Sequence, residues 1–111
     1  MITNLISTGD EILLGDILDT NCNYLCRQIK EIGGAVHRTC GIGDDLTAIS
    51  ETLTASSKKA DVCIVTGGLG PTRDDITAQA CAMAAGVPLT LNRTALAMIK
   101  AFFVEKGFPW T

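Results

Sequence analysis

A glycine-rich loop in the middle of the chain has the residue types that bind phosphate. The apolar run 62–65 leads into Thr66, Gly67, Gly68 and Gly70. Glycines let the backbone adopt positive φ, and they lack the Cβ that would keep a ligand away from main-chain N–H groups. A helix that begins after such a loop adds a positive N-terminus that favours anions. The stretch therefore predicts a phosphate-binding loop.

The residues after the glycines predict the first turn of that helix. Thr72 and Asp75 have the spacing of a capping box, and we expect the helix to run from about Asp74 to Ala85. Two interpretations of these residues stay open. They either bind the ligand and its cation, or Asp75 is only the capping partner of Thr72 and Asp74 is a first-turn acid that faces the helix dipole.

The elements around the loop alternate between strand and helix patterns. Short apolar runs predict three strands, and apolar residues at helical spacing before glycine or proline predict four helices. The expected strands are 2–7, 35–40 and 62–65. The first expected helix is capped by Thr20 or Asn21, and the others begin near Leu46, near Asp74 and at Asn92 or Arg93. This alternation is typical of a parallel sheet with right-handed crossovers. We therefore predict a three-layer α/β/α fold with a mainly parallel, Rossmann-like sheet.

A strand order of 2-1-3 would place the ligand between the first and third strands. In open α/β sheets the ligand binds at the carboxyl ends of the strands, where the strand order reverses. There the corner at Gly9 and Asp10 would face the glycine loop, with Gly43 and Asp44 at the rim. The alternatives are that Gly9 and Asp10 form a simple turn and that Asp44 or Asp45 caps the next helix.

Acidic side chains beside a phosphate imply a bound cation. A carboxylate about 4 Å from a phosphate oxygen costs on the order of 4 kcal/mol at an effective dielectric constant of ~20, more than the ~0.3–1 kcal/mol that a helix N-terminus returns. Mg²⁺ or a similar divalent metal removes this repulsion and polarises the phosphorus for attack. Asp75 and Asp10 are the expected metal ligands, and Asp75 and Asp44 are the candidate catalytic residues.

Composition excludes several classes of protein. The 111 residues are 47% hydrophobic and carry a formal net charge of −3, which gives no basic face for nucleic acid. No apolar run approaches the ~20 residues that a membrane span requires. Met1 leads directly into a strand pattern without a signal peptide. We therefore expect a cytoplasmic protein with a small-molecule ligand, which binds neither nucleic acid nor a membrane.

The cysteines and the histidine are expected to be structural. The five cysteines lie in apolar segments without a Cys-x-x-Cys pair or a nearby histidine, which predicts reduced packing residues. The lone His37 is expected at the surface or at a strand edge. Neither a Walker A pattern nor the dinucleotide fingerprint is present, so conventional nucleotide triphosphatases and Rossmann dehydrogenases fit poorly.

The expected sheet is small. Three parallel strands leave two open edges and little core, and no strand pattern follows the third strand to pair beside it. We therefore expect residues 1–111 to be the N-terminal part of a longer single domain.

The motifs resemble the molybdopterin-binding domain in its CinA form. The resemblance covers nearly the whole chain and rests on the segments 7–15, 19–21, 42–44 and 67–77. Asp75 matches the acid of the family loop, and Thr77 matches its final threonine. Leu69 stands where relatives of the MogA and MoaB type have threonine, and Asp74 precedes the matched acid. These two differences favour the CinA branch.

The resemblance implies a function as well as a fold. For the CinA branch, whose members are called competence- or damage-inducible, it implies metal-dependent hydrolysis of ADP-ribose at its pyrophosphate. MogA and MoaB proteins bind molybdopterin and use the loop in adenylylation or metal insertion, which makes molybdopterin the alternative ligand. A non-catalytic nucleotide-sensing module is the third hypothesis. We also expect a homo-oligomer that binds a nucleotide or a pterin.

Overall fold

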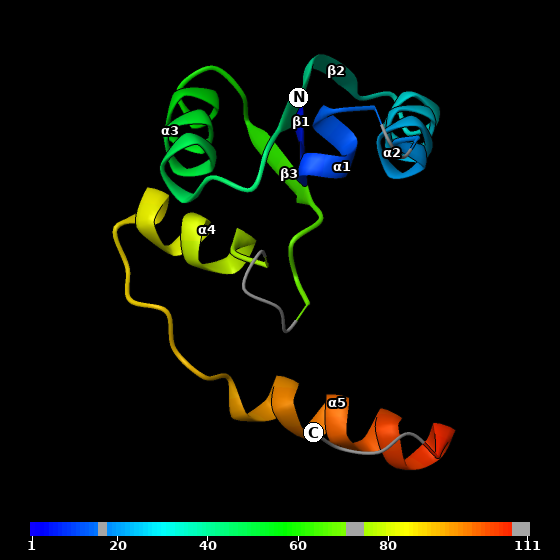
Figure 1. The fold of residues 1–111 in the computed structure, drawn as a ribbon. Helices are drawn as coiled ribbons and strands as arrows, with labels where there is room; N and C mark the ends of the chain where they lie inside the picture. Colours follow the sequence, from blue (N-terminus) through cyan, green and yellow to red (C-terminus); the bar gives the residue numbers. More distant parts are fainter. Residues whose placement is uncertain (16–17, 71–74, 108–111) are drawn as a thin grey trace.

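The computed structural model describes residues 1–15, 18–70 and 75–107 (Figure 1). In chain order the elements are β1 (Ile2–Thr8), α1 (Asp10–Leu13), α2 (Thr20–Glu31), β2 (Ala35–Ile42), α3 (Leu46–Ser57), β3 (Val62–Thr66), α4 (Thr77–Ala85) and α5 (Arg93–Lys106). All three predicted strands and all four predicted helices are present, and the short helix α1 occupies the corner where the sequence predicted a turn.

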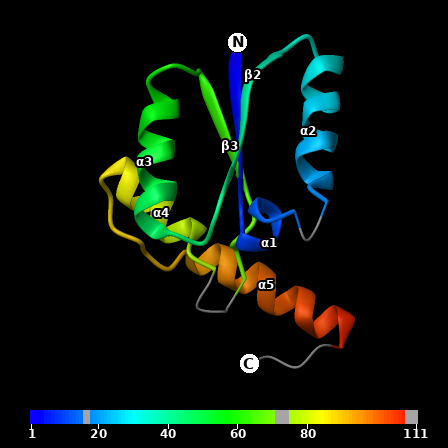
Figure 2. The same ribbon diagram turned by 45° about the horizontal axis from the view of Figure 1, so that its top comes forward.

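The sheet has the predicted order, β2-β1-β3, and both strand pairs are parallel. Helix α2 covers one face, and α3 and α4 lie on the other (Figure 2). This arrangement confirms the three-layer α/β/α fold. Because β1 is central and the chain adds β2 on one side of it and β3 on the other, the strand order reverses between β1 and β3, at their carboxyl ends.

The core lies between the sheet and the helices α3 and α4. Ile6, Ile49, Leu53 and Ala80 form a buried cluster there. Successive side chains of a strand point to opposite faces, so Leu5 points away from Ile6, and it is also buried. Complete burial of each large aliphatic side chain stabilises the fold by about 1.5–3 kcal/mol. This packing holds β1 rigidly at the centre of the sheet.

The helix starts differ from the sequence prediction in two places. The side chain of Asp19, rather than Thr20 or Asn21, caps α2 by accepting the N–H of Cys22. Helix α4 begins at Thr77, not near Asp74, and its N-cap Ile76 gives no side-chain hydrogen bond. The capping box at Thr72 lies outside the described residues.

Helix α5 stands apart from the sheet (Figure 1). It has the predicted start, since the side chain of Asn92 accepts the N–H of Ala95. None of its residues is buried, and its apolar side chains Met98 and Phe102 are exposed.

No helix within the described ranges is long and apolar enough to cross a membrane.

Candidate functional site

Two consecutive glycines shape the loop that follows β3. Gly67 has φ 89° and Gly68 has φ 64°, in the region that side chains with a Cβ rarely adopt. A Cβ on Gly67 would lie 2.5 Å from the carbonyl oxygen of Thr8, and one on Gly68 would meet the hydroxyl of Thr77. The loop therefore approaches the end of β1 and the start of α4 more closely than any other residue would allow.

Two buried threonines hold this loop in place. The Thr77 hydroxyl donates to the carbonyl of Gly67 at 2.7 Å, and the Thr77 N–H donates to the carbonyl of Gly68 at 3.2 Å. The Thr8 hydroxyl lies 3.0 Å from the Thr77 hydroxyl and 3.1 Å from the carbonyl of Thr66. Each hydroxyl carries one proton, so one of the two threonines shares its proton between a loop carbonyl and the other hydroxyl. Thr8 and Thr77 are only 3% and 2% exposed.

This threonine pair turns the loop carbonyls inward. The N–H groups of Gly68 and Gly70 donate to no backbone carbonyl among the described residues. Thr77 binds the carbonyls of Gly67 and Gly68, so the negative ends of these peptide dipoles are already paired. Backbone N–H groups of the loop can then donate to an anion. The predicted ligand-binding residues Thr66, Gly67, Gly68 and Thr77 thus belong to one hydrogen-bonded unit, and Gly70 follows in the same loop.

The second wall is a reciprocal pair of aspartates after β1 and β2. The N–H of Asp44 donates to Oδ1 of Asp10 at 2.8 Å, and the N–H of Asp10 donates to Oδ2 of Asp44 at 3.3 Å. The N–H of Gly9, which has φ 133°, donates to the carbonyl of Ile42 at 2.9 Å. Asp45, not Asp44, caps α3 by accepting the N–H of Ala48. Asp44 is therefore joined to the β1 corner, as the crevice prediction requires.

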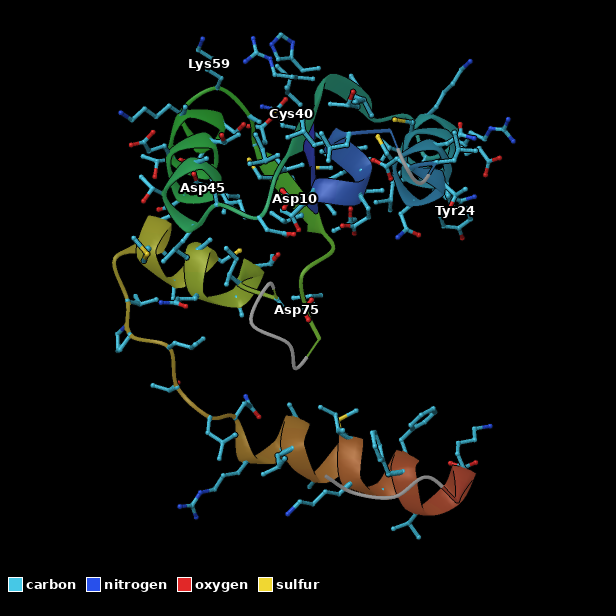
Figure 3. All side chains as sticks on the ribbon, viewed as in Figure 1. Asp10, Tyr24, Cys40, Asp45, Lys59 and Asp75 are labelled. Atoms are coloured by element: carbon cyan, nitrogen blue, oxygen red, sulfur yellow. The ribbon has the colours of Figure 1, made fainter. Side chains whose placement is uncertain are left out.

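Asp75 lies against the glycine loop. A Cβ on Gly70 would be 2.8 Å from Oδ2 of Asp75, so this half-buried carboxylate packs directly on the Gly70 backbone. Figure 3 shows Asp10 and Asp75 at the same end of the sheet. The predicted site residues Thr72 and Asp74 lie outside the described residues.

The carboxylates fit a hard cation that takes its other ligands from a substrate. In the described part of the chain, no three His, Cys, Asp or Glu side chains are close enough to hold a metal by themselves. Mg²⁺ typically takes one or two carboxylates and completes its shell with phosphate oxygens and water. Asp10 is exposed and Asp75 half-buried, and both supply the oxygen ligands that Mg²⁺ prefers. Asp10 and Asp75 could therefore serve only a metal that takes its remaining ligands from a bound phosphate and water.

Cysteine chemistry has no role at this site. The five cysteines are free thiols and are all partly buried, as predicted for packing residues. Burial raises the pKa of the Cys22 and Cys63 thiols above its ordinary value, which keeps them protonated and weakly nucleophilic near neutral pH. His37 is exposed on β2, an edge strand, as predicted.

Thr8 is the site residue that the motif analysis missed. It is the last residue of β1, directly before Gly9, and its hydroxyl links β1 to both β3 and α4. A hydroxyl at the carboxyl end of a buried strand, next to a predicted ligand loop, is the sequence signal that could have identified it.

The family model described as "Probable molybdopterin binding domain" matches residues 4–108. The chain belongs to this family. The match includes the glycine loop, the aspartate pair, β2, β3 and all of β1 except Ile2 and Thr3. Among curated relatives, a CinA-like protein from Desulforapulum autotrophicum is 40% identical over 109 residues, which are 98% of this chain and 26% of the relative. The chain therefore spans about a quarter of the length of the curated relatives that it matches.

Solved structures in this family have the same fold. The protein CinA with unknown function from Thermoplasma acidophilum superposes with a TM-score of 0.86 at 33% identity, covering 92% of this chain and 60% of that one. The molybdopterin biosynthesis enzyme MoaB from Thermus thermophilus gives a TM-score of 0.66 at 20% identity, covering 74% and 53%. These findings confirm the resemblance to CinA, and the MoaB match shows a shared fold.

The Thr77 hydroxyl is expected to stabilise the loop measurably. Thr77→Val keeps the shape of the side chain but leaves the Gly67 carbonyl without its donor and the Thr8 hydroxyl with only the Thr66 carbonyl, which should lower the free energy of unfolding by about 2 kcal/mol. Thr77→Ser keeps the hydroxyl and should cost only about 1 kcal/mol for the lost methyl group. Urea unfolding of the two variants measures the difference. Equal losses in both would show that the hydroxyl contributes nothing.

Proposed function

We propose that this domain binds a nucleotide diphosphate and hydrolyses its pyrophosphate with the help of a divalent metal, with ADP-ribose as the substrate. The observation that carries the proposal is the threonine-anchored glycine loop with a carboxylate packed on its backbone. A carboxylate this close to a bound phosphate would repel it, because both groups are negatively charged. A cation between them turns the repulsion into binding.

The glycine loop would hold the diphosphate. Its N–H groups and the N-terminus of α4 would both face the diphosphate, and backbone donors suit phosphate oxygens of either phosphoryl group. Because Thr8 and Thr77 fix the loop before substrate arrives, the donors need no reorganisation during the reaction. The loop thus positions the phosphorus that is attacked.

The three aspartates would bind the metal and activate the attacking water. Asp75 and Asp10 would hold the metal, which supplies Lewis-acid polarisation of the phosphoryl group and an activated water when bound. Asp44 is held beside Asp10 by the two reciprocal hydrogen bonds, so it would orient the attacking water and accept its proton. In the balanced reaction the water oxygen bonds to one phosphorus, the bridging oxygen leaves with the other, and the products are AMP and ribose 5-phosphate.

Molybdopterin binding or adenylylation is the second candidate function. The family description itself and the MoaB-like fold support it. Leu69, which is 72% exposed beside the glycines, replaces the threonine of the MogA and MoaB loop and is the reason that we rank this function second. Competition between a pterin and ADP-ribose would separate the two functions. The expected homo-oligomer and cytoplasmic location stay predictions.

The direct assay is AMP release from ADP-ribose by the full-length protein. We expect turnover with Mg²⁺ or Co²⁺ and a return to background after chelation with EDTA. Metal-independent turnover would contradict the role of the aspartates, and a complete lack of AMP with every divalent metal would contradict the proposed reaction.

Gly43→Ala should reduce this turnover without unfolding the protein. A Cβ on Gly43 would lie 2.6 Å from Oδ1 of Asp10, so the flexible carboxylate must move and lose the N–H of Asp44. We expect about a tenfold lower kcat, in the range seen when groups that orient metal ligands are removed. Gly41→Ala is the matched control, because its Cβ meets nothing within 4 Å. Equal activity of the two variants would contradict the role given to the aspartate pair.

A further inference from the structure

A separate cavity lies between β2 and α3. Its volume is about 230 Å³, and Asn4 of β1, His37 and Arg38 of β2, Ser56 of α3 and the following Lys59 are among the residues that line it. A shift in the register of β1 and β2 shapes this cavity. Thr3 pairs with Val36 but Asn4 pairs with Arg38, so β2 has one extra residue at His37 and bulges there.

A buried acceptor in this cavity has no partner. Asn4 is 3% exposed, and its Oδ1 makes no hydrogen bond. Buried side-chain oxygens are nearly always hydrogen-bonded, because loss of water without a replacement costs free energy. The lining hydroxyl of Thr52 does not help, since it donates to the carbonyl of Ala48 at 2.8 Å. Asn4 thus requires a donor from whatever fills the cavity.

The charged groups around the cavity are basic. Arg38 and Lys59 line it together with His37, and no Asp or Glu is among the described lining residues. These positive side chains repel a cationic ligand and attract an anionic one, so an anion that carries a donor suits both the charges and the oxygen of Asn4. Each cation alone has an ordinary explanation, because charged residues protect edge strands and lysines favour helix C-termini. Neither explanation accounts for the unpartnered oxygen of Asn4 between them.

We propose that this cavity binds the phosphate group of a small phosphomonoester or free phosphate. With a second pKa of about 6, a phosphomonoester at neutral pH is mainly a dianion, and its minor monoanionic form carries an O–H, as hydrogen phosphate does. Its O–H would donate to Oδ1 of Asn4 while its charged oxygens accept from Arg38 and Lys59. The cavity is several times larger than the ~30 Å³ of one water molecule, which leaves room for an organic substituent.

This cavity is distinct from the aspartate and glycine site. Asn4 precedes Thr8 by four strand residues, which is about 13 Å along β1. Lys59 comes before β3 and Asp75 after it, and Figure 3 shows these two residues at opposite ends of the sheet. The proposal therefore goes beyond the hydrolysis proposed above, and each can fail without the other.

Calorimetric titration of the full-length protein with inorganic phosphate and with sulfate tests the proposal. Sulfate has the same shape and no proton at neutral pH, so phosphate should bind about tenfold more tightly at equal ionic strength. Arg38→Met and Lys59→Met should each weaken phosphate binding about tenfold, and Lys58→Met, an exposed neighbour outside the cavity, should leave it unchanged. Repeating the titration with ribose 5-phosphate shows whether an ester or the free ion is preferred.

Asn4→Leu tests the role of the unpartnered oxygen. This nearly isosteric change should abolish the preference for phosphate over sulfate, and it should raise the melting temperature because a buried unpaired acceptor is removed. Absent phosphate binding, equal binding of phosphate and sulfate, or unchanged affinity in Arg38→Met and Lys59→Met would each overturn the proposal. The arginine and lysine variants decide the question even if Asn4→Leu does not fold.

Discussion

Gly67→Ala is expected to lower the free energy of unfolding by about 3 kcal/mol or more. A residue with a Cβ at φ 89° carries about 1–2 kcal/mol of backbone strain. The added Cβ would also lie 2.5 Å from the carbonyl oxygen of Thr8. That oxygen is backbone at the end of the buried central strand, so it cannot move aside as a side chain would. Urea unfolding monitored by circular dichroism measures the loss.

Two glycines elsewhere in the chain serve as controls for this variant. Gly86 has φ 68° and a Cβ there would meet nothing within 4 Å, so Gly86→Ala measures the backbone strain alone. Gly41→Ala has neither the positive φ nor a close contact and should be nearly neutral. The account is contradicted if Gly67→Ala costs no more than Gly86→Ala, because the close approach to Thr8 would then be unimportant.

Asp75→Asn is expected to reduce kcat for ADP-ribose hydrolysis by about 100-fold or more while the fold is retained. The amide keeps the size of the side chain and its packing on Gly70, but it removes the charge that would hold the metal. A loss of this size is typical when one preorganised group at a reacting centre is removed. Initial rates of AMP release at saturating Mg²⁺ measure the effect.

The matched control for Asp75 is an acid far from the loop. Glu51 is exposed on α3, so Glu51→Gln changes the net charge equally and should leave kcat within about twofold. If Asp75→Asn also stays within twofold, Asp75 has only a structural role in the loop, which was the alternative interpretation of its sequence position.

The strands, the helices and most of their bounds could be predicted from the sequence. Apolar runs of strand length, glycine stops and side-chain caps are local signals. The order 2-1-3 is one of several that right-handed crossovers allow, and no residue pattern selects it. The start of α4 could not be predicted in this way. Thr77 donates both its N–H and its hydroxyl to the glycine loop, so the tertiary fold decides where that helix begins.

The sequence predicted which loops form the site, but it did not predict the hydrogen bonds that join them. The glycines and Asp75 can be recognised from their residue types. The hydrogen bond between Asp10 and Asp44, by contrast, joins residues 34 positions apart and depends on the pairing of β1 with β2. The cavity at Asn4 was beyond sequence analysis for a similar reason. It depends on one extra residue in β2, and no residue pattern marks that bulge.

The most direct test of the central claim is a crystal structure of the full-length protein with Mg²⁺ and a non-hydrolysable analogue of ADP-ribose. The account predicts the diphosphate on the N–H groups of Gly67, Gly68 and Gly70, with the metal between its oxygens and the carboxylates of Asp75 and Asp10. A diphosphate bound elsewhere, or bound at this loop with both carboxylates turned away from any metal, would contradict it.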